Sequence, residues 1–433
     1  MSENVTVHPA RAGLRGRLRV PGDKSVSHRA IMLASLAHGV SRIHGFLEGE
    51  DTRNTARAFA AMGVQIDTPS ESERIVHGVG LNGLNAPTSP LDLGNAGTGM
   101  RLLAGVMAAQ RFDSVLTGDA SLSARPMKRV IAPLRLMGAK IDGRDSEFPP
   151  LLITGGQALH GIRYETPVAS AQIKSCVLLA GLYADTDTTL IEPVGTRDYT
   201  ESMLQRFGAQ LHVEGQAVVL RAGAELRAYD VEVPGDFSSA AFFIVAATIV
   251  PDSDLTLVGV GLNRFRTGLL EALRAMGANI EVYPGDDAEM GAIRIRSAAL
   301  KGVDLDPALV PNMIDEFPAF FVAASVAHGV TRVRGAHELR VKESDRIAVM
   351  ARALGACGVG IDELPDGVVI AGGKPISGAA FVDSAGDHRC AMSMAVAAMV
   401  SQAPIQIRDC ANVRTSYPTF FSSAEKLGIT IEH

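Results

Sequence analysis

One pattern recurs six times along the 433 residues and limits the folds available to this chain. In each copy a turn leads into a helix of small apolar residues and a strand, and an amphipathic helix and another strand follow. The apolar helices begin near Asp23, Asn95, Ser170, Asp236, Asp315 and Asp387. We expect each amphipathic helix to end at a glycine with left-handed backbone. These glycines are Gly63, Gly138, Gly208, Gly277, Gly355 and Gly428. Two landmarks with one period favour six repeats over chance recurrence of a short Gly-Ala-x-Ile motif.

Helices and strands alternate within every repeat, which predicts an α/β fold, or α+β in some schemes. The first helix of each repeat is apolar on all sides and is predicted to be buried, whereas the second has a polar face and is predicted to be exposed. Six buried helices do not share one core comfortably, so we expect two lobes of three repeats each. The boundary is predicted near residues 231–237.

Composition argues against several classes of protein, namely nucleic-acid-binding, membrane-spanning, secreted and cysteine-based metal-binding proteins. The net charge is −6 and no basic tract occurs, which argues against nucleic acid as the main partner. Apolar runs reach about a dozen residues, short of the roughly 18 needed to span a membrane. The first residues lack the apolar core of a secretion signal, so we expect a cytoplasmic protein. The cysteines are scattered and predict reduced core residues, with neither a disulfide nor a metal site. They are Cys176, Cys357, Cys390 and Cys410.

The stretch LRVPGDKSVSHRAIMLASLAHG, residues 18–39, places Lys24 and Arg29 in the first turn of an apolar helix. The start of a helix already carries about half a positive charge, so cations there oppose stability. An anion bound at the helix start explains them, because the free N–H groups of the first turn bind phosphates and carboxylates.

Polar residues also occupy the other five turns. They are Asn95, Gly97 and Arg101; Ser170, Gln172 and Lys174; Asp236 and Ser238; Asp315 and Glu316; and Asp387, His388 and Arg389. If the repeats pack alike, we expect these turns to converge on a cleft between the lobes, joined by the basic loops 123–129 and 340–346. The alternatives are helix caps at Asp236 and Asp315, a cap-turn hydrogen bond at His388, and a solvated helix over 340–355. Residue types and spacing thus predict a strongly anionic ligand and a carboxylate placed to act as general base.

Six motifs together resemble the 5-enolpyruvylshikimate-3-phosphate (EPSP) synthase family, the 3-phosphoshikimate 1-carboxyvinyltransferases. They are PGDKSVSHRA, LGNAGTGMRLLAG, PVASAQIKSCVLLAGL, TRDYTE, VKESDR and GDHRCAMS, in the family's order and across nearly the whole chain. The resemblance implies two lobes of three βαβαββ units, each lobe like an inside-out α/β barrel with buried helices. The lobes would be residues 23–235 and residues 1–22 with 236–433, and the active site would lie in the cleft between them.

The same resemblance implies a transferase of the shikimate pathway, which leads to chorismate and the aromatic amino acids. The enolpyruvyl group of phosphoenolpyruvate would pass to the 5-hydroxyl of shikimate 3-phosphate, with release of phosphate and without a metal or organic cofactor. We expect no membrane or nucleic-acid partner and a monomer.

Site residues follow from the resemblance, position by position. The shikimate 3-phosphate ligands would be Lys24, Ser25, Arg29, Ser170, Ala171, Gln172, Arg197, Asp315 and Lys342. The phosphoenolpyruvate ligands would be Lys24, Gly97, Arg125, Gln172, Arg346 and Arg389. Asp315 would be the base for the 5-hydroxyl, Glu343 the acid and base at the methylene carbon, and Lys24 the third catalytic group. The choice between Glu343 and Lys24 as proton donor stays open.

The chain departs from a common family pattern near its end, where Thr415 stands at the position of a lysine and Arg414 precedes it. Glyphosate-resistant relatives resemble a chain with alanine at the position of Gly97, so the resemblance implies that glyphosate binds here, where Gly97 leaves room that a methyl group would fill. Two rival functions remain. The related transferase that acts on UDP-N-acetylglucosamine has Lys-Asn at the opening turn and a reactive loop cysteine, whereas this chain has Lys24-Ser25 and no cysteine before Cys176. A non-catalytic sensor of sugar phosphates would need the cations but neither Asp315 nor Glu343.

Overall fold

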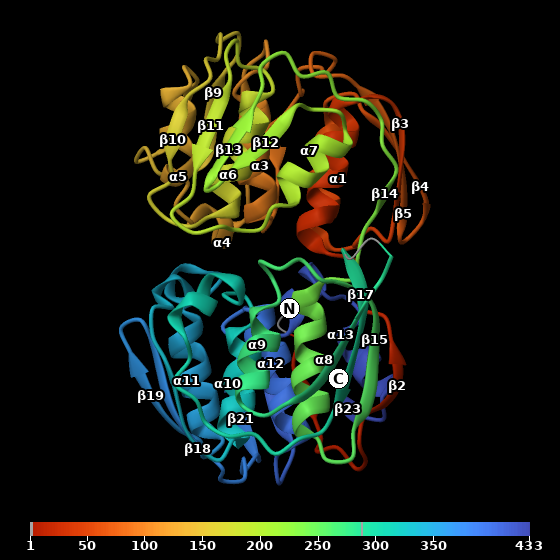
Figure 1. Ribbon diagram of the computed structural model, residues 1–433, viewed down its shortest axis with the longest axis vertical. Coiled ribbons are helices and arrows are strands. Elements are labelled where there is room, and N and C mark those ends of the chain that lie inside the picture. Colours follow the sequence, from red (N-terminus) through yellow and green to blue (C-terminus); the bar gives the residue numbers. More distant parts are fainter. Residues whose placement is uncertain (1–2, 287–288) are drawn as a thin grey trace. The chain divides into compact units, whose positions relative to one another are not determined.

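The computed structural model describes residues 3–286 and 289–433. The chain forms two compact units, shown in Figure 1. The central unit is the continuous segment Gly22–Val233, and the split unit combines Met1–Pro21 with Pro234–His433. Each unit is described by itself below.

The central unit contains three four-stranded sheets, with strand orders β14-β3-β5-β4, β6-β7-β9-β8 and β10-β11-β13-β12. The strands are β3 (His38–His44), β4 (Gln65–Ser70), β5 (Glu73–Val79), β6 (Leu91–Asp92), β7 (Ser114–Thr117), β8 (Lys140–Arg144), β9 (Phe148–Thr154), β10 (Arg163–Glu165), β11 (Thr188–Ile191), β12 (Leu211–Glu214), β13 (Ala217–Leu220) and β14 (Val231–Glu232). The helices are α1 (Lys24–Leu36), α2 (Glu50–Ala61), α3 (Gly97–Met107), α4 (Ala120–Ser123), α5 (Lys128–Leu136), α6 (Ala171–Gly181) and α7 (Tyr199–Arg206).

The split unit also contains three sheets, with strand orders β16-β17-β15-β2, β18-β20-β19 and β21-β22-β1-β23. The strands are β1 (Val5–Val7), β2 (Arg15–Leu18), β15 (Asp254–Gly261), β16 (Asn279–Pro284), β17 (Met290–Arg296), β18 (Gly329–Val333), β19 (Gly360–Leu364), β20 (Gly367–Gly372), β21 (Ala380–Asp383), β22 (Ile405–Arg408) and β23 (Ile431–Glu432). The helices are α8 (Phe237–Ile249), α9 (Gly268–Ala275), α10 (Phe317–Val326), α11 (Arg346–Ala356), α12 (His388–Met399) and α13 (Phe420–Lys426), with 3₁₀ turns η1 (Pro307–Asn312), η2 (His337–Val341) and η3 (Ala411–Thr415).

Each sheet is built around one predicted repeat. In the third repeat, β10 pairs in parallel with β11 across the buried helix α6, and β12 and β13 then form an antiparallel hairpin after α7. A parallel pair needs a crossover helix, whereas a hairpin needs only a turn, which gives the order βαβαββ. Six sheets in two units of three confirm the predicted repeats and fold class.

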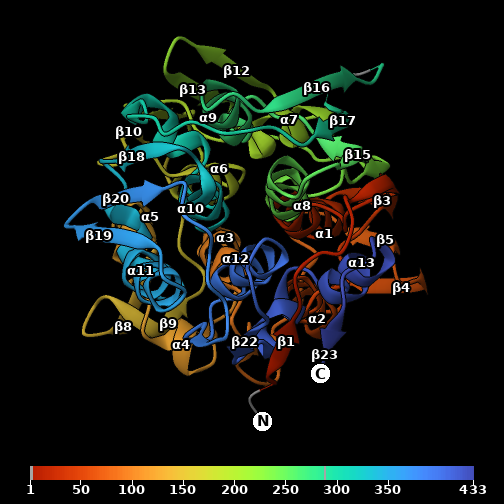
Figure 2. The same ribbon diagram turned by 90° about the horizontal axis from the view of Figure 1, so that it is seen from below.

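The predicted buried helices form the core of each unit. Helices α8, α10 and α12 pack against one another in the split unit, and Figure 2 shows its sheet β18-β20-β19 on the outer side of α10 and α11. All ten residues of α10 except Val326 are buried, as expected for a helix that is apolar on every side. The four cysteines are buried in the cores, and burial raises the pKa of the Cys357 thiol to about 11. In the described ranges, no helix is both long enough and apolar enough to cross a membrane.

The chain passes between the units at two copies of one tetrapeptide, Val-Pro-Gly-Asp, at residues 20–23 and 233–236. The strand before the first copy, β2, pairs in parallel with β15 of the split unit, and the strand before the second copy, β14, pairs in parallel with β3 of the central unit. Each copy ends in an aspartate that caps the next helix, Asp23 for α1 and Asp236 for α8. The two crossovers therefore share sequence, strand pairing and cap.

The predicted helix starts agree with the structure within two residues. One predicted helix end is wrong. Gly355 lies inside α11, and Gly358 instead has the left-handed backbone, with φ +83°. The other five glycines have φ between +91° and +98°, as predicted for the residue after a helix.

Candidate active site

The start of α1 holds the first group of predicted residues. Asp23 caps the helix by accepting from the backbone N–H of Val26 at 2.9 Å. The Lys24 ammonium lies 2.9 Å from the carboxylate of Asp51, which is itself almost buried. The first turn thus carries a cation whose charge is partly balanced by α2. Sequence analysis missed Asp51, because nothing in the acidic run 48–51 marks which carboxylate turns inward.

Arg29 is only 3% exposed and its guanidinium joins three elements. It donates to the Ser25 carbonyl at 2.8 Å, to Thr200 Oγ1 at 2.7 Å and to Ser175 Oγ at 2.6 Å. Burial lowers the pKa of Arg29 to about 10, although Asp23 opposes this shift. Arg29 therefore fixes the opening turn to α6 and α7 of the same unit.

The start of α3 is surrounded by guanidinium groups. A Cβ atom added to Gly97 would lie 2.9 Å from Arg125 Nη1 and 3.3 Å from Arg101 Nη1. Arg101 donates to the side-chain Oε1 of Gln172 at 2.9 Å, and Arg125 donates to Asn95 Oδ1 at 2.8 Å. Helix α3 has no side-chain cap, so its first N–H groups and two arginines form a cationic turn around a glycine.

The start of α6 brings Ser170 and Gln172 to the same place. Ser170 is the cap of α6 and accepts from the N–H of Ile173, while Gln172 donates to Thr98 of α3 at 2.9 Å. Arg197 lies in the loop before α7, half-buried, and its charge is one of those acting on Arg29. Hydrogen bonds from Arg29 and Arg101 thus connect the starts of α1 and α3 with α6 and α7.

Lys174 does not belong to this cationic group, contrary to the sequence analysis. It is 1% exposed and points into the unit, where its ammonium lies 2.8 Å from Glu192 and 2.6 Å from Glu201. Because nearly all of α6 is buried, including its polar residue Ser175, the sequence does not reveal which way its one lysine points. Lys174 is a buried structural cation.

In the split unit, acidic and basic side chains alternate at the starts of the three buried helices. Asp315 precedes α10, and its Oδ1 lies 3.4 Å from Arg346 and 3.9 Å from Lys342. Its backbone carbonyl accepts from Arg389 at 3.0 Å. Asp315 does not cap α10, because the cap position is Glu316, which makes no side-chain cap bond. The Asp315 carboxylate instead faces the cations around it, and 14% of its side chain is exposed.

Arg346 is 1% exposed and contacts three carboxylates. They are Asp387 at 2.8 Å, Glu343 at 2.5 Å and Asp315 at 3.4 Å. Burial alone would lower the pKa of Arg346, but these anions raise it above its usual range. Conversely, although burial disfavours its charge, the pKa of Asp387 is held below normal by Arg346. Arg346 is thus permanently charged and holds the 342–346 loop and the start of α12 together.

The structure decides which of the aspartates at helix starts act as helix caps. Asp236 and Asp387 are caps, since each accepts backbone N–H bonds at the start of its helix. The solvated helix over 340–355 is wrong, because residues 342–345 form a loop and α11 begins at the buried Arg346. Near the chain end, Arg414 is exposed and pairs with Glu3 at 2.8 Å, while Thr415 is buried and donates to the Asn412 carbonyl at 2.7 Å.

Arg266 is a further buried cation that sequence analysis missed. It lies in the loop before α9, is 3% exposed, and faces Asp236, Asp315 and Glu316. The repeat itself carried a signal for it. Arg125, Arg197 and Arg266 each lie two or three residues before the second helix of their repeats, α5, α7 and α9.

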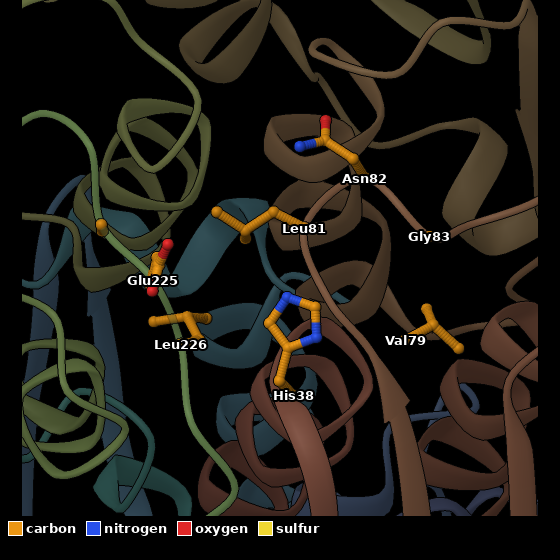
Figure 3. A pocket seen from close by; sticks show the side chains of 8 residues that line it. His38, Val79, Leu81, Asn82, Gly83, Glu225 and Leu226 are labelled. Carbon is orange, nitrogen blue, oxygen red and sulfur yellow. The ribbon is translucent and has the colours of Figure 1, made fainter.

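A cavity of about 370 Å³ lies elsewhere in the central unit (Figure 3). The His38 ring lies in it between Leu226 and Val79, and Glu225 lines it too. Its eight lining residues include none of the predicted site residues. Among the residues described, no group of three or more His, Cys, Asp or Glu side chains could hold a metal ion.

Comparison with known proteins identifies the family. The family model for EPSP synthase (3-phosphoshikimate 1-carboxyvinyltransferase) matches residues 9–423. The chain is 58% identical to the 3-phosphoshikimate 1-carboxyvinyltransferase of Xanthomonas oryzae pv. oryzae, over 100% of this chain and 99% of that one. The corresponding protein of Xanthomonas euvesicatoria pv. vesicatoria is 59% identical with the same coverage.

Solved structures agree. The EPSP synthase of Acinetobacter baumannii has 48% identity and a TM-score of 0.89, covering 99% of both chains. The enolpyruvyl transferase NikO of Streptomyces tendae has a TM-score of 0.83 at 18% identity and shares the fold. The chain therefore belongs to the EPSP synthase (3-phosphoshikimate 1-carboxyvinyltransferase) family.

Proposed function

We propose that this chain carries out the reaction of its family on the family's two small-molecule substrates. The enolpyruvyl group of phosphoenolpyruvate is transferred to the 5-hydroxyl of shikimate 3-phosphate, and phosphate is released. The methylene carbon gains a proton, the hydroxyl oxygen bonds to C2 as its own proton leaves, and the tetrahedral intermediate then loses a proton from the new methyl group together with phosphate. The observation that carries this assignment is the partly exposed Asp315 carboxylate beside the buried guanidinium groups of Arg346 and Arg266.

In the central unit we assign the anion contacts. Lys24, Ser25, Arg29, Ser170, Ala171, Gln172 and Arg197 bind shikimate 3-phosphate, and Lys24, Gly97, Arg125 and Gln172 bind phosphoenolpyruvate. The assignment is supported by the N–H groups without a side-chain cap at the start of α3, and by the Arg101 guanidinium that joins this turn to Gln172 of α6. Forked guanidinium groups suit the paired oxygens of carboxylates and phosphates.

In the split unit we assign the proton transfers. Asp315 takes the proton of the 5-hydroxyl, Glu343 is the acid and base at the methylene carbon, Lys342 holds shikimate hydroxyls, and Arg346 and Arg389 bind phosphoenolpyruvate. Arg346 is engaged with three carboxylates, so we propose that substrate binding exchanges part of these contacts. We also propose that the protein works in the cytoplasm and that it is a monomer. Light scattering of the purified protein measures its molar mass and so tests the monomer.

Phosphate release is the direct test of the activity. The purified protein is mixed with phosphoenolpyruvate and shikimate 3-phosphate in the presence of EDTA, and a parallel sample contains UDP-N-acetylglucosamine in place of the shikimate ester. We expect phosphate only with the shikimate ester. Release with the nucleotide sugar would identify the related transferase, and no release from folded protein would leave a phosphate-binding protein.

Glyphosate inhibition is expected to depend on Gly97. Its backbone φ is ordinary, so alanine fits the helix, but the added methyl group would lie 2.9 Å from Arg125 Nη1 and displace that guanidinium. A displaced guanidinium weakens its hydrogen bond to a bound anion, and a hydrogen bond to a charged group is worth about 1.5–3 kcal/mol. Gly97→Ala should therefore raise the inhibition constant of glyphosate by roughly tenfold to a hundredfold. Equally weak inhibition of wild type and variant would rule out the steric argument.

A further inference from the structure

Arg266 lies where three carboxylates of the split unit meet. Its Nη2 donates to Ser238 Oγ at 2.6 Å and to Asp236 Oδ1 at 3.2 Å, and lies 3.9 Å from Glu316 Oε1. Its Nη1 lies 3.8 Å from Asp315 Oδ2. The guanidinium is 3% exposed, so it is buried together with the anions it serves. Such a cation is retained only where it is paired and hydrogen-bonded.

The two oxygens of Asp315 face different arginines. Oδ1 lies toward Arg346, from the start of α11, and Oδ2 lies toward Arg266, from the loop before α9. Arg346 is fixed in turn by Asp387 and Glu343. A carboxylate held from both sides has its plane set by its neighbours, which a general base needs in order to meet the proton it removes.

Arg266 is itself anchored on the side away from Asp315. Asp236 is fixed as the cap of α8, because it accepts from the N–H groups of Ser238 and Ser239. Ser238 Oγ accepts from Arg266 and donates to Glu316, so one hydroxyl links the arginine to the residue next to Asp315. Anchored through Nη2, the guanidinium presents Nη1 to Asp315.

We propose that Arg266, held by Asp236 and Ser238, is a positioning residue for the Asp315 carboxylate in catalysis. Arg266 does not act on substrate in this scheme. It sets the orientation and charge environment of the group that accepts the 5-hydroxyl proton. The proposal rests on the assignment of Asp315 as that base.

The charges around Asp315 give the proposal a signature in the pH profile. The groups that face it are Arg266, Arg346, Lys342, Arg389 and Glu316, with Glu343 held against Arg346. Burial raises the pKa of Glu316, which Arg266 opposes. Loss of one cation makes Asp315 easier to protonate, so the acidic limb of kcat/KM should move to higher pH.

The experiment compares Arg266→Met and Arg266→Lys in the full-length protein with wild type. We expect Arg266→Met to lower kcat by about 10- to 100-fold, with KM for both substrates changed less than about threefold, since misplacement of a catalytic group lowers kcat. Its acidic limb should move to higher pH. Arg266→Lys retains the positive charge but not the forked guanidinium group. We therefore expect kcat to fall while the acidic limb of the pH profile stays close to that of wild type.

The control is Arg264→Lys, in the same loop but exposed and stacked on Phe265, which should behave as wild type. Wild-type kcat and pH profile in Arg266→Met would overturn the proposal. If that variant does not fold, Arg266→Lys decides, because kcat within twofold of wild type would equally overturn it.

Asp315→Asn separates the assignment of Asp315 as the base from the proposed role of Arg266. An active Asp315→Asn enzyme contradicts the assignment of the base, whereas an inactive one beside a fully active Arg266→Lys enzyme contradicts only the role of Arg266. In the Asp315→Asn background, Arg266→Lys should have no further effect on kcat.

Discussion

Asp315→Asn is expected to lower kcat by about 10²- to 10⁴-fold, the usual contribution of a general base. Asparagine has nearly the same shape as aspartate and keeps an oxygen for Arg346 or Lys342, but it takes no proton at neutral pH. The bound substrates therefore keep most of their contacts, and KM for both should change much less than kcat. Steady-state phosphate release measures both constants.

A matched control separates catalysis from folding. Asp362, on β19, is exposed, so Asp362→Asn should leave kcat unchanged. Thermal unfolding of both variants should lie close to that of wild type. Retention of more than a tenth of wild-type kcat in Asp315→Asn would remove Asp315 from its proposed role and leave Glu343 as the next candidate.

Lys174→Met should give the largest loss of stability that we predict. Removal of the lysine leaves Glu192 and Glu201 as buried carboxylates without their shared cation. Loss of one partner from a buried ion pair costs about 3–5 kcal/mol in the free energy of unfolding. Urea unfolding followed by circular dichroism measures this loss.

The control for this prediction is the exposed pair of Arg332 and Asp304, which lie 3.1 Å apart. Arg332→Met should cost less than about 1 kcal/mol, because solvent screens a surface pair. Equal losses in the two variants would contradict the structural role of Lys174. The double variant with Glu201→Gln should recover part of the stability, since it removes one of the two unpaired charges.

The loss of unfolding free energy in Lys174→Met should also depend on pH. Burial raises the pKa of Glu201 above its ordinary value of 4.5, while Lys174 opposes that shift. A carboxyl with a raised pKa binds its proton more tightly in the folded state than in the unfolded state. The free energy of unfolding therefore falls as the pH rises from about the unfolded pKa to the folded pKa. Without Lys174 the pKa rises further. The variant should therefore lose more stability at about pH 8 than at about pH 5.5.

Local signals in the sequence predicted most helix starts, because caps such as Asp23, Ser170 and Asp236 act within three residues of where they occur. The same locality explains the error at the end of α11. The stretch Leu-Gly-Ala-Cys-Gly offers two glycines, and the choice of Gly358 depends on where the following strand pairs. Local sequence carries no record of that pairing.

The site shows the same division. Lys24 and Arg29 could be singled out because cations oppose the charge at a helix start, whereas Asp315 was assigned as the base only through the family resemblance. Arg266 was not singled out, because its partners are distant in sequence: Asp236 lies at the start of the same repeat and Asp315 lies in the next one. Lys174 was placed with the wrong group, because the direction of a side chain on a buried helix is set by tertiary packing. Comparison of equivalent positions among the six repeats would have found Arg266.

The pairing of β1 has a consequence for the order in which the chain is made. Val5 pairs with Ile407, 402 positions later in the sequence. At about 5–20 residues per second, the ribosome needs roughly 20–80 s to supply that partner. During this time the whole of Gly22–Val233 emerges with every strand of its three sheets. The first strand of the split unit waits unpaired until synthesis is nearly complete, and its length of three residues limits the opportunity for wrong pairing.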